Sequence, residues 1–153
     1  MLQLTGMRME DLPEVMALER AGHDFPWSEG VMASCLSRHH RARLLYEDQV
    51  LVGFAILQEV LDEATLLNMV IAATARRRGH GRWLLERLIA EVDAGVSVIH
   101  LEVRPSNHAA IALYESMGFN EYARRPRYYP RRGGGYEDAM LMALTLASDT
   151  MRL

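Results

Sequence analysis

The spacing of apolar residues changes along the chain, and each spacing predicts a different kind of element. Alternating or short continuous apolar runs predict strands, and they occur at 2–7, 43–46, 50–57, 64–71, 96–103, 119–122 and 139–146. Apolar residues three and four positions apart predict helices, and they occur at 11–20, after Ser28, at 82–92 and at 107–117. This order of elements predicts a mixed α/β sandwich with helices on both faces of the sheet.

Residues at the ends of these runs predict where the helices begin and end. Pro13 suits the first turn of the first helix, where its missing N–H costs little. Ser28 and Asn107 are good N-caps for the second and the last helix. Gly118 stands where a left-handed residue is expected to end a helix. Between the last two strands we expect a loop rich in arginine, tyrosine and glycine.

Length and composition are typical of a globular protein. The chain has 153 residues, of which 50% are hydrophobic and 24% charged, so we expect a single domain over residues 1–147 and a C-terminal tail at 148–153. The formal net charge of −3 gives no overall reason to expect nucleic-acid binding. Cys35 is the only cysteine, which excludes an intramolecular disulfide and favours a buried, inert thiol. No basic leader and no apolar run of about 20 residues is present, so we expect a cytoplasmic protein that does not enter membranes.

The most informative motif is a basic, glycine-containing turn between a predicted strand and a predicted helix. It reads Arg76-Arg77-Arg78-Gly79-His80-Gly81. The first amides of a helix lack helical partners and favour an anion, and glycine lets the backbone approach a phosphate closely. The turn lacks the Lys-Ser/Thr pair of a P-loop and the third glycine of a dinucleotide fingerprint. It suits a pyrophosphate held by amides and arginines without magnesium, although the turn alone leaves open a merely solvated basic connection.

Motifs spread over nearly the whole chain carry a family resemblance. The basic turn, the element order around it and the run Asn107–Phe119 resemble the GCN5-related N-acetyltransferase (GNAT) family. Within that family the chain is similar to the RimI-type ribosomal-protein alanine N-acetyltransferases, through Phe25–Glu29, Leu61–Leu66, Leu101–Arg104, Tyr128–Pro130 and Glu137–Ala139. The resemblance implies a mostly antiparallel sheet of about seven strands with splayed central strands. It also implies an enzyme that acetylates the N-terminal alanine of small-subunit ribosomal protein eighteen by direct attack in a ternary complex.

The resemblance assigns acetyl-CoA to two segments and one helix cap, with no metal ion. The pyrophosphate would be held by Arg76, Arg77, Arg78, Gly79, His80, Gly81 and Arg82. The backbone of Met69, Val70 and Ile71 would face the pantetheine arm, and an N–H near Val70 would polarise the thioester carbonyl. Judged by the residues alone, these three belong to an ordinary core strand. Asn107 is likewise a cap, to which the resemblance adds a contact with the cofactor arm.

Acetyl transfer to an amine requires a base for the ammonium and an acid for the leaving thiolate. Glu102 interrupts an apolar strand, so it is either solvent-facing or functional, and the resemblance favours the base. Deprotonating an α-ammonium, with a pKa of roughly 7.7–8.0, is easier than deprotonating a lysine at roughly 10.4. Tyr114 lies in the helix that begins after Asn107; an aromatic residue there often only packs, and the resemblance makes it the acid.

Aromatic residues in two segments are candidates for contacting the acceptor, a ribosomal-protein N-terminal peptide. Phe25 and Trp27 lie between the first two helices. Tyr128 and Tyr129 precede the final strand. They would wall a narrow entrance that suits a small first residue, or else cover the edge of the core. The basic residues nearby are expected to form a solvated loop and not a nucleic-acid site; they are Arg124, Arg125, Arg127, Arg131 and Arg132.

Other functions stay open on the sequence alone. An enzyme with the same fold and cofactor could acetylate another protein N-terminus, a lysine or a small amine. A protein of another class would be a non-catalytic acyl-CoA-binding module that regulates a partner, which the presence of both a base and an acid candidate disfavours. A nucleic-acid-binding module built on the arginines is the least favoured. The sequence does not indicate an oligomeric state or a partner that completes the site.

Overall fold

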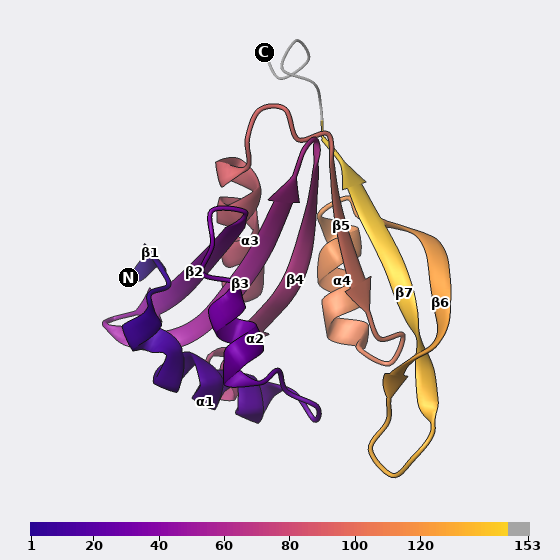
Figure 1. Cartoon of the computed structure of the whole chain (residues 1–153), viewed down its shortest axis with the longest axis horizontal. Coiled ribbons are helices and arrows are strands. Elements are labelled where there is room, and N and C mark those ends of the chain that lie inside the picture. Colours follow the sequence, from indigo (N-terminus) through magenta and orange to yellow (C-terminus); the bar gives the residue numbers. More distant parts are fainter. Residues whose placement is uncertain (147–153) are drawn as a thin grey trace. The chain divides into compact units, whose positions relative to one another are not determined.

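The computed structural model describes residues 1–146, and its strands form one sheet (Figure 1). The strands are β1 (Leu2–Gly6), β2 (His40–Glu47), β3 (Val50–Val60), β4 (Glu63–Ile71), β5 (Val98–Val103), β6 (Asn120–Pro130) and β7 (Tyr136–Thr145). The helices are α1 (Leu12–Gly22), α2 (Glu29–Ser34), α3 (His80–Glu91) and α4 (His108–Ser116), with short 3-10 turns at Met9–Asp11 and Ala73–Ala75. The predicted tail at 148–153 lies outside the described residues.

The strand order in the sheet is β1-β2-β3-β4-β5-β7-β6. β4 and β5 run parallel, whereas β1–β2, β2–β3, β5–β7 and β6–β7 are antiparallel. The parallel register covers 63–66 of β4 and 98–101 of β5, and the two strands then continue to Ile71 and Val103. The predicted sheet is confirmed: it is mostly antiparallel, and its central strands pair over only part of their length.

Contacts between residues divide the chain into two compact units. The first unit comprises Met1–Glu59 and Leu67–Val92, and the second comprises Val60–Leu66 and the chain from Asp93 onward. β4 contributes to both, because its first half pairs with β5 and its second half lies in the first unit. Since one strand is shared in this way, a single domain over 1–147 stays our prediction.

Helices cover both faces of the sheet in the first unit. α1 and α2 form a buried core with Leu44 of β2 and Phe54 of β3. Arg43 precedes Leu44 along β2, so its side chain points to the opposite face. There its guanidinium pairs with Glu91 of α3 at 2.9 Å. The predicted placement of helices on both faces is therefore confirmed within this unit.

In the second unit, α4 covers one face of β5 and β7. Ile99 of β5 is fully buried, whereas Glu102 lies an odd number of positions away and points to the other face. Gly118, just beyond α4, lies so close to the sheet that a Cβ there would be 3.2 Å from Leu144 Cδ1. Leu144 pairs with Ile99 and shares its face. α4 therefore packs on the face that carries Ile99, away from Glu102.

The predicted helix ends are confirmed by their hydrogen bonds. Ser28 Oγ accepts a bond from the Val31 N–H at 3.2 Å. Asn107 Oδ1 accepts one from the Ala110 N–H, also at 3.2 Å. Gly118 has a φ of +103°, a left-handed conformation that glycine adopts without strain. Local capping chemistry thus fixes the start of α2 and both ends of α4.

One predicted segment is wrong. The expected loop between the last two strands is largely strand, because β6 runs to Pro130 and β7 starts at Tyr136. The side chains of 120–128 are all exposed. An edge strand that is exposed throughout shows no alternation of apolar and polar residues, so the pattern of the sequence gives no signal for it. Arg124, Arg125 and Arg127 therefore lie on a strand and not in a loop.

Candidate functional site

The basic turn leads from the end of β4 into α3 and is open to solvent. α3 begins at His80, earlier than the predicted Arg82, because Gly79 caps it with a left-handed φ of +80°. A Cβ placed on Gly79 would meet no other atom within 4 Å, so a ligand can approach this backbone. The Trp83 N–H donates to the Gly79 carbonyl at 3.0 Å, and the amides before it in this turn lack helical partners. The geometry fits an anion site.

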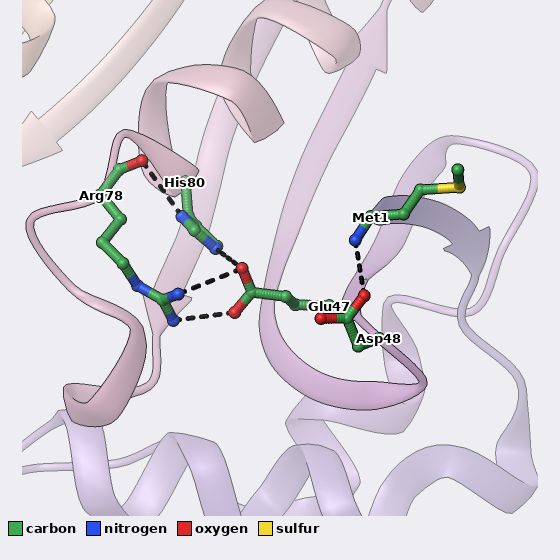
Figure 2. A network of polar contacts seen from close by, with 5 residues as sticks. All are labelled: Met1, Glu47, Asp48, Arg78 and His80. Carbon is green, nitrogen blue, oxygen red and sulfur yellow. Dashed lines mark hydrogen bonds and ion pairs between the residues drawn. The ribbon is translucent and has the colours of Figure 1, made fainter.

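One carboxylate holds two residues of this turn in place. Glu47, at the end of β2, accepts hydrogen bonds from Arg78 Nη2 at 2.8 Å and from His80 Nε2 at 3.1 Å (Figure 2). Partial burial raises the pKa of Glu47, but the bonds from His80 and Arg78 outweigh this effect and leave the pKa below its usual value. The neighbouring ion pair of Asp48 with the Met1 ammonium, at 2.6 Å, is exposed and contributes little. Arg78 and His80 thus stabilise the conformation of the turn through their bonds to Glu47.

The other arginines of the turn differ in how free they are. Arg76 Nε donates to the Ile71 carbonyl at 3.0 Å, which ties the turn to the end of β4. Arg82 pairs with Glu86 one helical turn later, at 2.8 Å. Arg77 is exposed, has a left-handed φ of +64° and makes no hydrogen bond or ion pair with any residue in 1–146. A left-handed arginine is uncommon, and Arg77 is the arginine of the turn best placed to meet an anion.

The second half of β4 has a backbone that is fixed by close packing. Val70 is buried, and its neighbours Met69 and Ile71 are partly exposed. Gly53 of β3 lies so near that a Cβ there would be 2.8 Å from the Val70 carbonyl oxygen. Only glycine allows β3 to approach this closely. The backbone of 69–71 is thus a rigid platform, and its contact with the pantetheine arm stays a prediction.

Glu102 lies in a polar cluster formed by β5 and β6. Its Oε1 accepts a hydrogen bond from Arg125 Nη2 at 3.0 Å. Burial raises the pKa of Tyr128, and the charge of Glu102 and a hydrogen bond to it raise this pKa further. The Arg125 guanidinium lies 5.1 Å from the centre of the Tyr128 ring. The side chain of Glu102 is 27% exposed, so the carboxylate is held in place and still open to water or an amine.

Tyr114 lies in α4, on the opposite face of β5 from Glu102. Its ring centre is 5.8 Å from that of Phe119, so the side chain packs in the core as an ordinary aromatic residue does. Burial raises the pKa of Tyr114 to about 12. The phenol therefore keeps its proton at neutral pH, which an acid must do until the leaving group needs it.

Tyr129 interacts electrostatically with both candidates for proton transfer. Burial raises its pKa, and the charges of Glu102 and Tyr114 raise it further. Interactions between charges weaken with distance and are screened by solvent, and both groups still affect the Tyr129 hydroxyl. The Arg104 guanidinium lies over the Tyr129 ring, 4.6 Å from its centre. Glu102 and Tyr114, which lie on opposite faces of β5, thus both influence the pKa of this residue.

The connection from β5 to α4 is pinned to the final hairpin. Arg104 donates to the Pro130 carbonyl at 2.8 Å and to Glu137 at 3.0 Å, and the Ser106 hydroxyl donates to Glu137 at 2.9 Å. Burial raises the pKa of Glu137, but the bonds from Arg104 and Ser106 lower it below its usual value. Asn107 follows directly and caps α4. Its additional contact with a cofactor stays a prediction.

The two aromatic segments lie in different units. Phe25 is 49% exposed and Trp27 packs partly buried against the core of the first unit. Tyr128 and Tyr129 belong to the second unit, where their rings are 4.9 Å apart and lie beside the Glu102 cluster. The structure thus brings the tyrosines to the candidate base, and the contact of all four residues with an acceptor stays a prediction.

Sequence reasoning missed a buried carboxylate on α1. Glu19 is 1% exposed, and it occupies a position that an apolar residue would take on the buried stripe formed by Leu12, Val15 and Met16. A charged residue at the next position of an apolar stripe is the signal that could have found it. Its contacts are described below.

Known proteins match the chain over most of its length. The family described as "Acetyltransferase (GNAT) family" matches residues 8–119. The chain belongs to the GNAT acetyltransferase family. This GNAT acetyltransferase is 46% identical over 145 residues to the [ribosomal protein bS18]-alanine N-acetyltransferase of Escherichia coli strain K12, covering 94% of this chain and 97% of that protein. It is 48% identical over 138 residues to the Salmonella typhimurium protein of the same description, covering 90% and 93%.

A solved structure agrees with these relatives. The crystal structure of the ribosomal-protein-S18-alanine N-acetyltransferase from Escherichia coli matches this GNAT acetyltransferase with a TM-score of 0.90 and 44% identity, over 99% of both chains. The predicted family, fold and enzyme class, an acetyl-CoA-dependent N-acetyltransferase, are confirmed. Within residues 1–146, none of the helices is both long and apolar enough to span a bilayer. The roles of single residues stay predictions.

Proposed function

We propose that this acetyltransferase transfers the acetyl group of acetyl-CoA to the N-terminal alanine of ribosomal protein bS18. The observation that carries the proposal is its similarity to relatives described by that activity, at 46% identity over 94% of this chain. A match confined to the basic turn would indicate only a shared cofactor, whereas this match extends over both compact units. We place the enzyme in the cytoplasm, acting as one domain over 1–147 without direct contact with nucleic acid.

The chain offers acetyl-CoA separate groups for each part of the molecule. The open amides at the start of α3 and the free Arg77 suit the pyrophosphate. Arg78 and His80 maintain the shape of the turn through Glu47. The backbone of 69–71 suits the amide groups of the pantetheine arm, and an N–H near Val70 would stabilise negative charge on the thioester oxygen.

Two side chains of the second unit suit the proton transfers. Glu102 takes a proton from the α-ammonium of the acceptor, directly or through one water, and the neutral nitrogen attacks the thioester carbon. The new C–N bond forms as the C–S bond breaks. Tyr114 gives its proton to the departing sulfur, and the second proton of the nitrogen goes to water. Each proton transfer of this kind is worth roughly 100- to 10,000-fold in rate.

Tyr128 and Tyr129 would limit the size of the acceptor's first side chain and so favour alanine. Both lie beside Glu102, so a nitrogen that reaches the carboxylate brings its first side chain close to their rings. A methyl group occupies less space than any larger side chain. We therefore assign these tyrosines to the acceptor site. Phe25 and Trp27 of the first unit are assigned separately to contact with the acceptor, on the resemblance alone.

Intact-mass spectrometry tests the proposed reaction. A peptide with the N-terminal sequence of bS18 is incubated with the protein and acetyl-CoA, beside one whose N-terminus is blocked but whose lysines are free. We expect one acetyl group on the first peptide, which fragmentation assigns to the α-amine of alanine, and none on the blocked peptide. Acetylation of the blocked peptide would favour a lysine acetyltransferase, and equal transfer to peptides with any first residue would contradict the preference for alanine.

A further inference from the structure

The buried carboxylate of Glu19 has no part in the chemistry proposed above. Burying a carboxylate is costly unless its oxygens are hydrogen-bonded, and both oxygens of Glu19 are. Oε2 accepts a bond from the Trp27 backbone N–H at 2.8 Å. Oε1 accepts one from Asn68 Nδ2 at 2.9 Å. One side chain of α1 thus contacts the segment before α2 and a strand of the sheet.

The network has a fixed direction. Asn68 donates to Glu19 through Nδ2, so its Oδ1 is left to face His23 Nε2 at 3.1 Å. His23 Nε2 also lies 3.5 Å from Glu19 Oε1. Both neighbours of this nitrogen are acceptors, so Nε2 carries a proton. His23 donates to Asn68, and Asn68 donates to Glu19.

Packing fastens the same segment to β4. Gly22, at the end of α1, lies so close to β4 that a Cβ there would be 2.8 Å from Val70 Cγ1. Val70 and Asn68 are separated by one residue and share a face of the strand. Trp27 packs against the core to which Val70 belongs. The segment is thus held on β4 at its Gly22 end and on the core at its Trp27 end, and Phe25 between them is 49% exposed.

We propose that Glu19 is a positioning residue that sets the preference for a small first residue of the acceptor. It acts through Trp27 and Asn68 by fixing the Phe25–Trp27 segment at one distance from β4. This inference rests on the proposed function, in which Phe25 and Trp27 contact the acceptor. A rigid entrance discriminates by size, whereas a loosened one binds alanine more weakly and admits larger residues.

A purely stabilising role does not require this carboxylate. A buried ionic group is often no more stabilising than a well-packed apolar residue of the same volume. An apolar side chain at position 19, however, could not accept the Trp27 N–H or orient the Asn68 amide. What the carboxylate adds is the conformation of one segment, and that segment carries the acceptor-site aromatics.

The substitution Glu19→Gln tests the proposal with little change in shape. The amide oxygen of the glutamine can accept only one of the two bonds, so its NH2 group must face either the Trp27 N–H or Asn68 Nδ2, and both are donors. We expect the KM for an alanine-initiated bS18 peptide to rise about tenfold. The KM for acetyl-CoA should stay within about twofold of wild type, because the phosphate turn is untouched. The preference for alanine over leucine as first residue, measured as a ratio of kcat/KM, should fall.

A second variant reverses the direction of one bond in the network, the bond between positions 19 and 68. In Glu19→Gln combined with Asn68→Asp, the glutamine at position 19 accepts the Trp27 N–H and donates to the aspartate. The aspartate also accepts the proton of His23, so every group has a partner again. We expect the peptide KM and the alanine preference to return toward wild type. Asn68→Asp alone places two carboxylates together and should impair the enzyme.

The outcomes separate this inference from the proposed function. Circular dichroism and thermal melting identify any variant that fails to fold, and the double variant then carries the test. Unchanged peptide KM and first-residue preference in folded Glu19→Gln would overturn the proposal, as would a folded double variant without recovery. If wild type prefers another amine, the proposed function fails, and the selectivity ratios are measured with that acceptor.

Discussion

At the scale of single residues, Tyr114 combines core packing with a proposed role as acid. Burial raises its pKa to about 12, well above a free thiol at roughly 8.5. The same desolvation disfavours a thiolate formed beside the phenol and so raises the pKa of the leaving thiol. The gap between the pKa of Tyr114 and that of the leaving group therefore narrows. A buried phenol is thus suited to giving up its proton only when charge develops on the sulfur.

The variant Tyr114→Phe removes the proton and preserves the ring. We expect kcat to fall about 100-fold, with the acetyl-CoA KM little changed, in steady-state kinetics. The alkaline stability should also change. The folded-state pKa lies above the unfolded value of roughly 10, so the stabilising contribution is complete below pH 10 and is lost as the pH rises through about 12.

For Tyr114 alone, we expect this loss of stability at alkaline pH to reach about 3 kcal/mol. Denaturant unfolding at pH 9 and pH 12 measures this loss. Between these two pH values, the unfolding free energy of wild type should fall further than that of Tyr114→Phe, by a difference of that order. An unchanged kcat would remove Tyr114 from the chemistry. Parallel pH profiles of stability would instead show that its proton is not held by burial.

Local signals in the sequence predicted the roles of single residues well, but they did not predict partners that are far apart in the chain. Ser28 and Asn107 were recognisable because a cap acts on residues two or three positions away. Glu19 was not, because its partners Trp27 and Asn68 come from another segment and another element. Glu47 was missed for the same reason, since its hydrogen bonds reach to the turn before α3.

At the scale of elements, the residues of the basic turn have two roles. Arg78 and His80 hold its shape through Glu47, whereas Arg77 is free to bind an anion. We expect Arg77→Ala to weaken acetyl-CoA binding about tenfold, since a charge-assisted contact is lost, and to flatten its salt dependence. Arg78→Ala and Glu47→Gln should weaken binding by less. Because Arg78 and Glu47 contact each other, their effects should not add, whereas the effects of Arg77→Ala and Glu47→Gln should.

Isothermal titration calorimetry with acetyl-CoA, on the single variants and both pairs, makes this comparison. Binding unaffected by Arg77→Ala, or additive effects of Arg78→Ala and Glu47→Gln, would contradict the division. The turn itself was predictable because its glycines and arginines are contiguous. The brace from β2 was not, because nothing near Glu47 in the sequence marks it as a partner of the turn.

The length of β6 is an element-scale feature that the sequence did not predict. Its register with β7 shifts twice, once between Glu121 and Ala123 and again between Arg125 and Tyr129. Bulges of this kind interrupt any regular alternation and re-aim side chains. Arg125 is thereby brought to Glu102, in a segment that the sequence predicted to be a solvated loop.

At the scale of the whole molecule, the mixed α/β class followed from the order of periodicities, whereas the mostly antiparallel sheet with splayed central strands followed from the family resemblance. Strand-like and helix-like runs follow one another in an order that few architectures accommodate. The double membership of β4 did not follow, because residues 64–71 form one continuous apolar run. The change of partner along that strand is set by β3 and β5, which the run itself does not encode.

The central claim is that Glu102 frees the α-amine of the acceptor, and single-turnover acetylation of the alanine-initiated bS18 peptide by Glu102→Gln tests it most directly. The matched control is His100→Gln, on the same face of β5, whose ring contacts Tyr122 and Glu63. We predict an unchanged acetyl-CoA Kd in both variants. The rate for Glu102→Gln should fall roughly 100- to 10,000-fold at neutral pH and partly recover above roughly pH 8, where the amine is free in solution. A wild-type rate for Glu102→Gln at neutral pH would contradict the account.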